Sequence, residues 1–152
     1  MKKSVDRLSL IKSMSQQCIA VRIRLLNRMI TNIYDSALSP FGVKLNQISI
    51  LVFIYLAGEV GYDALCRRLK MEKSTASRNI ERMKKKGWLK IATVKAERKK
   101  ALKITPAGEE LLGKVQEVWE DAQEKALSLL GEEGTDVLCK IANGIWKKDK
   151  AR

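Results

Sequence analysis

Residues 71–87 read MEKSTASRNIERMKKKG and have the pattern of a short basic helix. At about 3.6 residues per turn, Ala76, Ile80 and Met83 share one face of this helix. Polar and basic side chains spread over the other face, namely Lys73, Ser74, Ser77, Arg78 and Arg82. Because its outer face is small, hydroxylated and cationic, such a helix can approach the phosphates and base edges of a DNA groove. The segment therefore makes DNA binding the first hypothesis.

Positive charge is concentrated around this helix. The chain of 152 residues has 30 Lys and Arg against 17 Asp and Glu, which gives a formal net charge of +13. Residues 61–105 hold 15 basic and 4 acidic residues, whereas residues 106–152 hold 7 basic and 10 acidic ones. This uneven distribution is typical of a nucleic-acid footprint on one part of a protein. A solubilising lysine surface fits the charge alone equally well.

Length and composition favour one soluble globular subunit over residues 1–152. The 45% hydrophobic content is enough for a core. Residues 1–30 lack the unbroken apolar run of a secretory signal, because serines, glutamines and a lysine interrupt it. The longest apolar stretch, residues 48–57, is about half of the ~20 residues that a membrane span needs. We therefore expect a cytoplasmic location and no membrane partner.

The cysteine and histidine counts argue against catalytic and metal sites. Cys18, Cys66 and Cys139 are widely separated and form no CxxC pair, which disfavours a disulfide framework or a zinc cluster. The chain has no histidine, so the usual Ser/His/Asp and Cys/His arrangements are missing. No Gly-rich phosphate motif or catalytic carboxylate pattern stands out. We expect no enzyme activity, no cofactor and no metal.

The first half of the chain has helical periodicity. Residues 8–38 contain no proline or glycine and carry two apolar lines, which predicts one long helix with two buried sides. The segment Ser-Pro-Phe-Gly at 39–42 ends it, and residues 46–57 predict an apolar core helix that Gly58 stops. A short helix over 62–69 then leads through residues 70–72 into the basic helix. Two short helices joined in this way form a helix-turn-helix.

Beyond Gly87 the period changes to that of a strand. Residues 89–93 alternate, a charged turn follows at 95–100, and residues 102–104 alternate again, which predicts a β-hairpin with a basic tip. Thr105 and Pro106 have the residue types of an N-cap and a first helical position. We expect that helix to run to about Leu130, with Gly131 and Gly134 as punctuation. A last helix then continues to Lys147 and Lys148.

These elements predict a mainly α fold with a small β-hairpin wing. A winged helix-turn-helix lobe would span residues 40–105, and helical regions would cover 8–38 and 106–148. Neither end region can bury both of its sides inside so small a monomer, and exposed apolar area costs about 25 cal/mol per Å². We therefore expect both regions to pack against a second copy. The homodimer would place two basic helices about 34 Å apart and favour a palindromic operator in double-stranded DNA.

Three motifs in this order resemble the MarR family of winged-helix transcriptional regulators over nearly the whole chain. The first joins LCRRL at 65–69 to KSTASR at 73–78, which is similar to the family's paired DNA-binding helices. The second is ERMKKKGWL at 81–89, at the entry to the wing. The third is LKITPAG at 102–108, at the exit from the wing. The resemblance implies a DNA-binding regulator of transcription, in keeping with the helix-turn-helix expected from the residues.

The resemblance also implies a set of DNA-contacting residues. Ser74, Thr75, Ser77 and Arg78 would enter the major groove, while helix-start chemistry remains the alternative role for Ser74 and Thr75. Arg98 corresponds to the family's wing arginine, which reads the minor groove. The expected DNA-binding residues are Lys73, Ser74, Thr75, Ser77, Arg78, Arg82, Arg98, Lys99 and Lys100.

The chain departs from the family pattern at two positions. Ala96 stands where an aspartate would support the wing arginine, with Glu97 beside it, so the positioning of Arg98 is open. Glu72 stands where the basic helix would take Ser or Asp as its N-cap; it is a weaker cap, although its charge suits the helix dipole. Lys99 and Lys100 would add phosphate contacts at the wing.

Regulation by a ligand or by oxidation stays open. Many relatives are released from DNA by small aromatic or anionic effectors, but no residue here identifies one. We interpret Arg22, Arg24 and Arg28 as a solvated face or dimer ion pairs, and Tyr34, Trp88 and Trp119 as core aromatics. A cysteine-based redox sensor would use Cys18; no tyrosine lies within the following fifteen residues, and a buried structural cysteine is the default.

Two functional readings compete. The first is a sequence-specific regulator, with repression as the expected mode and release by an effector left open. The second is a non-specific chromosome-coating or RNA-binding protein, which would use the same charge without reading bases. Base-specific contacts from the basic helix separate the two.

Overall fold

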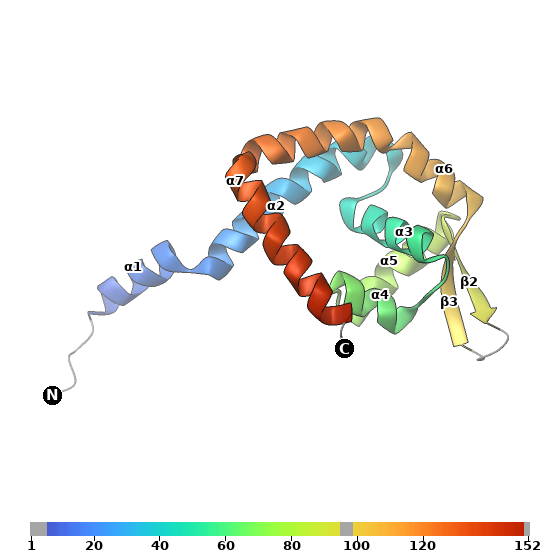
Figure 1. Ribbon diagram of the computed structural model, residues 1–152, viewed down its shortest axis with the longest axis horizontal. Coiled ribbons are helices and arrows are strands. Elements are labelled where there is room, and N and C mark those ends of the chain that lie inside the picture. Colours follow the sequence, from blue (N-terminus) through green and yellow to red (C-terminus); the bar gives the residue numbers. More distant parts are fainter. Residues whose placement is uncertain (1–5, 95–98, 151–152) are drawn as a thin grey trace.

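The computed structural model describes residues 6–94 and 99–150. It begins with α1 (Arg7–Gln17) and α2 (Ile19–Leu38), so the prediction of one unbroken helix over 8–38 is wrong. The break lies at Cys18, whose ψ of 110° is extended. No proline or glycine marks it, and none of the α1 residues is buried. In Figure 1, α1 extends away from the rest of the molecule.

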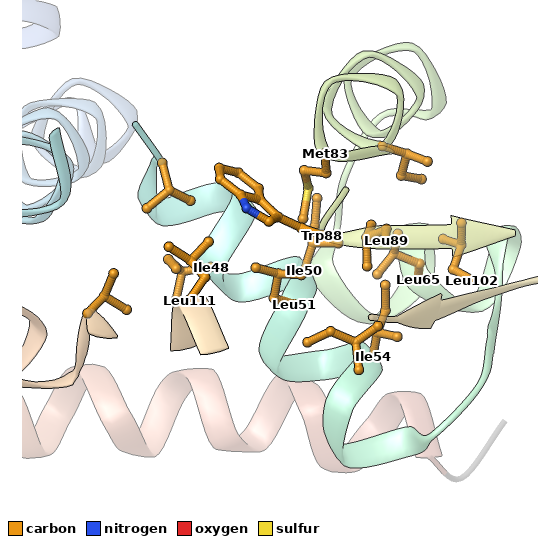
Figure 2. Close-up of a cluster of buried hydrophobic side chains, with 14 of the residues drawn as sticks. Ile48, Ile50, Leu51, Ile54, Leu65, Met83, Trp88, Leu89, Leu102 and Leu111 are labelled. Atoms are coloured by element: carbon orange, nitrogen blue, oxygen red, sulfur yellow. The ribbon is translucent and has the colours of Figure 1, made fainter. Parts of the chain in front are cut away.

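The helical part of the lobe follows the predicted order closely. A short 3-10 turn, η1 (Ser39–Phe41), precedes α3 (Leu45–Ala57), α4 (Tyr62–Leu69) and α5 (Lys73–Lys85). Ile50, Leu51 and Ile54 on α3 are completely buried. Figure 2 shows these side chains in one cluster with those of Leu65 from α4 and Met83 from α5. The expected core helix is therefore the centre of the lobe.

A three-stranded antiparallel sheet forms the wing and its base. β2 (Leu89–Val94) pairs with β3 (Lys99–Ile104), with Leu89 opposite Ile104 and Val94 opposite Lys99. The hairpin expected after Gly87 is thus present. A third strand, β1 (Val60–Gly61), pairs Val60 with Leu102, and the local pattern had not indicated it. The sheet order β1-β3-β2 ties the wing to the loop before α4.

The C-terminal helical region is interrupted at two positions rather than at the single one that the sequence predicted. α6 (Pro106–Lys114) begins with Thr105 as N-cap, as predicted, and ends at Val115, where φ is −90° and ψ is −1°. The prediction of one helix that runs without a break from Pro106 to about Leu130 is therefore wrong. α7 (Gln116–Lys150) is interrupted at Gly131, whose φ of 70° lies in the left-handed region that glycine tolerates best. The predicted break at Gly131 is confirmed, whereas Gly134 lies within the helix.

The two parts of α7 lie beside different helices. Its first part lies beside α2, and after Gly131 the chain returns to α4 (Figure 1). There the guanidinium carbon of Arg68 lies 4.3 Å from the centre of the Trp146 ring, a cation–π contact.

Across the described ranges, no single helix has the length and apolar character of a membrane span. One bent pair, residues 7–41 and 45–57 at 79°, meets that test jointly, by length and composition only.

Candidate nucleic-acid interface

α5 is anchored by one face and exposes the other. Ala76, Ile80 and Met83 are buried against the lobe, as the helical spacing predicted. On the opposite face, the side chains of Ser74, Ser77, Arg78 and Arg82 are exposed, as is that of Lys73, and Thr75 is half-buried. The structure thus brings the predicted helix residues together on one outward-facing surface. Arg78 donates from Nε to the Ser74 carbonyl at 3.2 Å, which holds its guanidinium along this surface.

The start of α5 is fastened to α4 by polar contacts. The Lys73 ammonium lies 2.8 Å from the Asp63 carboxylate, and the Tyr62 hydroxyl donates to the Lys73 carbonyl at 2.7 Å. The hydrogen bond to Lys73 lowers the pKa of Asp63 and, in return, raises the pKa of Lys73. The Glu72 side chain makes no capping hydrogen bond, in line with the weak cap expected. The two helices are therefore held in register by Asp63 and Tyr62.

Asp63, Tyr62 and Asn79 did not emerge from the sequence as site residues. Asn79 is buried on the inner face of α5, and its Nδ2 group donates to the Thr75 carbonyl at 2.9 Å. Its spacing from Ala76 and Met83 follows the i, i+3, i+7 pattern of a buried face, which would have identified it. Asp63 gave no such signal, because its partner Lys73 lies on another helix.

The wing is fixed at its base, and two of the predicted basic residues belong to its strand β3. Thr105 donates from Oγ1 to the Gly87 carbonyl at 2.5 Å, and its N–H donates to the Trp88 carbonyl at 3.1 Å. Lys100 is exposed on β3 and lies opposite Thr93, and Lys99 also belongs to β3. Arg98, with its neighbours Ala96 and Glu97, lies outside the described residues.

Close contact between α6 and the wing requires Gly108. A Cβ atom at this position would lie 2.4 Å from the Trp88 carbonyl oxygen and 2.7 Å from Cγ1 of Ile104. The Gly108 N–H also donates to Thr105 Oγ1 at 3.2 Å, so the LKITPAG segment links the hairpin to α6 through hydrogen bonds and close packing. These contacts fix α6 against the base of the wing.

A second surface of the molecule is apolar. Large hydrophobic side chains remain exposed along α1, α2 and the second part of α7: Leu8, Leu10, Ile11, Met14, Ile19, Val21, Ile23, Leu25, Leu26, Met29, Val137, Leu138, Ile141 and Ile145. A groove of about 760 Å³ runs between α2 and α7, lined by residues that include Ile23, Leu26 and Leu138. We call these exposed residues and the groove the apolar arm surface. Within one chain, the expected second buried side of these helices is left uncovered.

The residues considered for effector or redox roles are distributed as follows. Tyr34 and Trp88 are buried core aromatics, as expected, whereas Trp119 is 38% exposed. The Tyr34 hydroxyl donates to Gln123 Oε1, and burial raises its pKa. Arg22, Arg24 and Arg28 are exposed, and the Arg22 guanidinium donates to the carbonyls of Gln16 and Cys18.

The cysteines form no cluster. Cys18 is half-buried at the α1–α2 break rather than in a core, Cys66 is buried, and Cys139 is exposed. Burial raises the pKa of the Cys66 thiol, which disfavours its reactive thiolate form. Among the residues that the structure describes, no group of three Cys, Asp or Glu side chains is arranged to hold a metal ion.

Comparison with known proteins finds one matching family model and several solved structures with a similar fold. Residues 41–99 match the family model described as the MarR family. No curated protein matches the sequence. A mutant of MarR from E. coli complexed with operator DNA has a TM-score of 0.77 at 16% identity, covering 88% of this chain and 96% of that one.

Two further solved structures share the fold. The M. tuberculosis transcriptional regulator MosR has a TM-score of 0.73 at 26% identity, covering 90% of this chain and 98% of its own. BpsR of Bordetella bronchiseptica has a TM-score of 0.75 at 15% identity, covering 85% of this chain and 93% of its own. The DNA binding of BpsR is regulated by 6-hydroxynicotinic acid. The chain is therefore similar to these proteins over most of its length.

Proposed function

We propose that this chain is a homodimeric regulator of transcription that binds a specific double-stranded DNA operator. The premise is that residues 41–99 match the MarR family and that the described residues have the MarR winged-helix fold. The observation that carries the proposal is the outward face of α5. It presents hydroxyls and cations from a helix whose other face is locked into the lobe. A rigid helix with short polar side chains at its start suits base readout in a major groove.

The proposed DNA contacts divide by chemistry. We assign Arg78 to the O6 and N7 atoms of guanine, and Ser74, Thr75 and Ser77 to base edges or nearby phosphates. Lys73 and Arg82 contact the phosphates on either side. Lys99, Lys100 and Arg98 follow the backbone along the minor groove. The local excess of positive charge in residues 61–105 supports this assignment, because phosphate contacts provide most of the sequence-independent affinity.

Dimerisation rests on the apolar arm surface. In this proposal residues 8–38 and 106–148 form the helical dimerisation region, and residues 40–105 form the DNA-binding lobe. A second copy would cover the apolar side chains of α1, α2 and α7 that one chain leaves in water. Two-fold symmetry then places two α5 helices on successive turns of one DNA face, about 34 Å apart, over a palindromic operator.

The regulatory mode that we propose is repression with release by a small aromatic or anionic effector. The support for an effector is the similarity to BpsR, whose DNA binding responds to 6-hydroxynicotinic acid. A redox response through Cys18 has less support, because that residue is half-buried rather than freely accessible to an oxidant.

The test of the proposal compares specific with non-specific DNA binding in Arg78→Ala. Loss of a bidentate base contact should weaken binding to the operator by about 1–3 kcal/mol, roughly 5- to 150-fold, and relax preference at one position of each half-site. Binding to unrelated duplexes should change little. Lys125→Ala, which removes an exposed charge from α7, is the control. An equal loss on every sequence would instead favour a coating or RNA-binding protein.

A further inference from the structure

A separate pocket lies where the end of α5 meets the start of α3. It has a volume of about 390 Å³, within the range of pockets that hold small ligands, and the Trp88 ring forms part of its wall. Gly42 forms another part, with a φ of 64°, and a Cβ atom there would lie 3.3 Å from the Lys86 ammonium. The glycine turn therefore leaves the space that the end of Lys86 occupies.

The charged residues of this pocket are all cations. Lys44, Arg82, Lys85 and Lys86 contribute to its lining, and no Asp or Glu does. Across residues 6–94 and 99–150, none of the four forms a salt bridge. The Lys86 ammonium lies 5.6 Å from the centre of the Trp88 ring, a cation–π contact that supplies no negative charge. Four cations without a salt-bridge partner among the described residues, around one concave space, attract a multiply charged anion.

A buried amide adds hydrogen-bond donors to the cationic lining. Gln47 is 93% buried and lines the pocket. Its Oε1 atom accepts the Lys44 N–H at 3.1 Å, so its Nε2 group is the end of the amide left for a ligand. The Asp35 carboxylate binds the N–H of Leu45 at 2.8 Å but does not line the pocket, so it adds no acceptor to this space.

We propose that this pocket binds phosphate groups, and that Gln47, Lys44 and Lys86 are its principal ligating residues. Ammonium groups bind phosphate oxygens as point charges, and the buried amide provides directional donors beside them. The phosphate can come from a free phosphorylated small molecule or from the backbone of bound DNA, because Arg82 connects the pocket to the outer face of α5. The chemistry of the site is the same for both sources.

The first experiment titrates inorganic pyrophosphate into the full-length protein by isothermal titration calorimetry, without DNA and at low salt. Gln47→Glu is the central variant, because glutamate keeps an acceptor for the Lys44 N–H but replaces the donor end with negative charge. We expect saturable binding at one site per subunit, weakened about tenfold or more by Gln47→Glu and by Lys86→Ala. Lys140→Ala, an exposed lysine of α7, should leave it unchanged. Circular dichroism checks that each variant is folded.

DNA binding by the same variants distinguishes the two sources. If Lys86→Ala loses pyrophosphate but keeps its DNA affinity, the pocket serves a free phosphorylated ligand. If it also weakens DNA binding, lowers the slope of log K against log salt by about one, and pyrophosphate competes with DNA, the backbone is the source. Absence of pyrophosphate binding together with unchanged DNA binding in both variants would overturn the proposal. An equal loss in Lys140→Ala would overturn it as well, since binding would then reflect net charge alone.

Discussion

The lobe (residues 40–105) and the arms, by which we mean α1, α2 and the second part of α7, differ in how far their apolar residues are buried. In the lobe, Leu51 and Ile54 are completely buried and the hydrophobic residues of α3, α4, α5 and the sheet form one core. Along α1 and α2, comparable side chains such as Ile23, which is 60% exposed, face water. Most large apolar side chains of the lobe are therefore covered within one chain, with exceptions such as Leu56, whereas most of those along α1 and α2 are not.

The difference assigns separate tasks to the two regions. Burying an aliphatic side chain stabilises a protein by roughly 1.5–3 kcal/mol, so a lobe with a closed core can hold α5 rigidly by itself. The arms can gain a similar stabilisation only from another surface. In the proposed dimer, the lobe presents the DNA-contacting helix α5, and the arms set the distance between two such helices.

Ile23→Asp should have the largest effect, because it places a charge in the groove of the apolar arm surface. We expect sedimentation analysis to show monomers and affinity for a palindromic operator to fall by about 10²–10⁴-fold, since the two lobes are no longer linked. Leu56→Asp, at a lobe position that is 78% exposed, is the matched control and should remain dimeric. A dimeric Ile23→Asp protein with unchanged operator affinity would remove the arms from the interface.

Leu51→Ala probes the lobe and should come next in size. Truncation of a completely buried leucine leaves a cavity, and the free energy of unfolding should fall by about 2–5 kcal/mol in urea denaturation. Leu56→Ala on the same helix removes the same atoms from an exposed position and should change stability by less than about 0.5 kcal/mol. Equal effects from the two substitutions would contradict the division between buried and exposed positions on α3.

Thr105→Ala tests the junction between the two regions. The substitution removes the acceptor of the Gly108 N–H and the donor to the Gly87 carbonyl, so stability should fall by about 0.5–2 kcal/mol. Thr105→Ser keeps the hydroxyl and should recover most of the loss in thermal denaturation. Failure of serine to recover stability would show that the methyl group, rather than the two hydrogen bonds, matters at this position.

Asp63→Asn should produce the smallest change, and its pH dependence gives the clearest signature. The pKa of Asp63 is lowered in the folded state, so its contribution to stability is present above the unfolded pKa and is lost as pH falls through the folded pKa. The wild type should therefore be the more stable protein near neutral pH, and the difference should vanish in acid. A denaturation series across this range measures it, and a difference that persists in acid would rule out the ion pair as its cause.

Most of the lobe could be predicted from local patterns. The bounds of α4, the buried face of α5, the hairpin and the N-cap at Thr105 follow from helical spacing, strand alternation and capping chemistry. These signals lie within a few residues of one another along the chain. The predicted contact residues of α5 likewise lie on one exposed face, while their contacts with DNA remain a prediction.

The elements missed by sequence reasoning depend on distant contacts. β1 consists of two residues whose pairing partner lies about forty positions away, so no local alternation could indicate it. The break at Cys18 has no proline or glycine beside it, and the break at Val115 follows Gly113 by two residues but falls at a valine that is buried in the core. The link from Asp63 to Lys73 joins two helices, lowers the pKa of Asp63 and raises that of Lys73.

Selection from a pool of random duplexes tests the central claim most directly. The full-length protein is bound to the pool at several salt concentrations, and the bound DNA is sequenced. The account predicts an enriched palindrome with half-sites about one helical turn apart, together with a steep fall in affinity as salt rises. Strong, salt-sensitive binding without any enriched sequence would contradict it and favour a protein that coats nucleic acid.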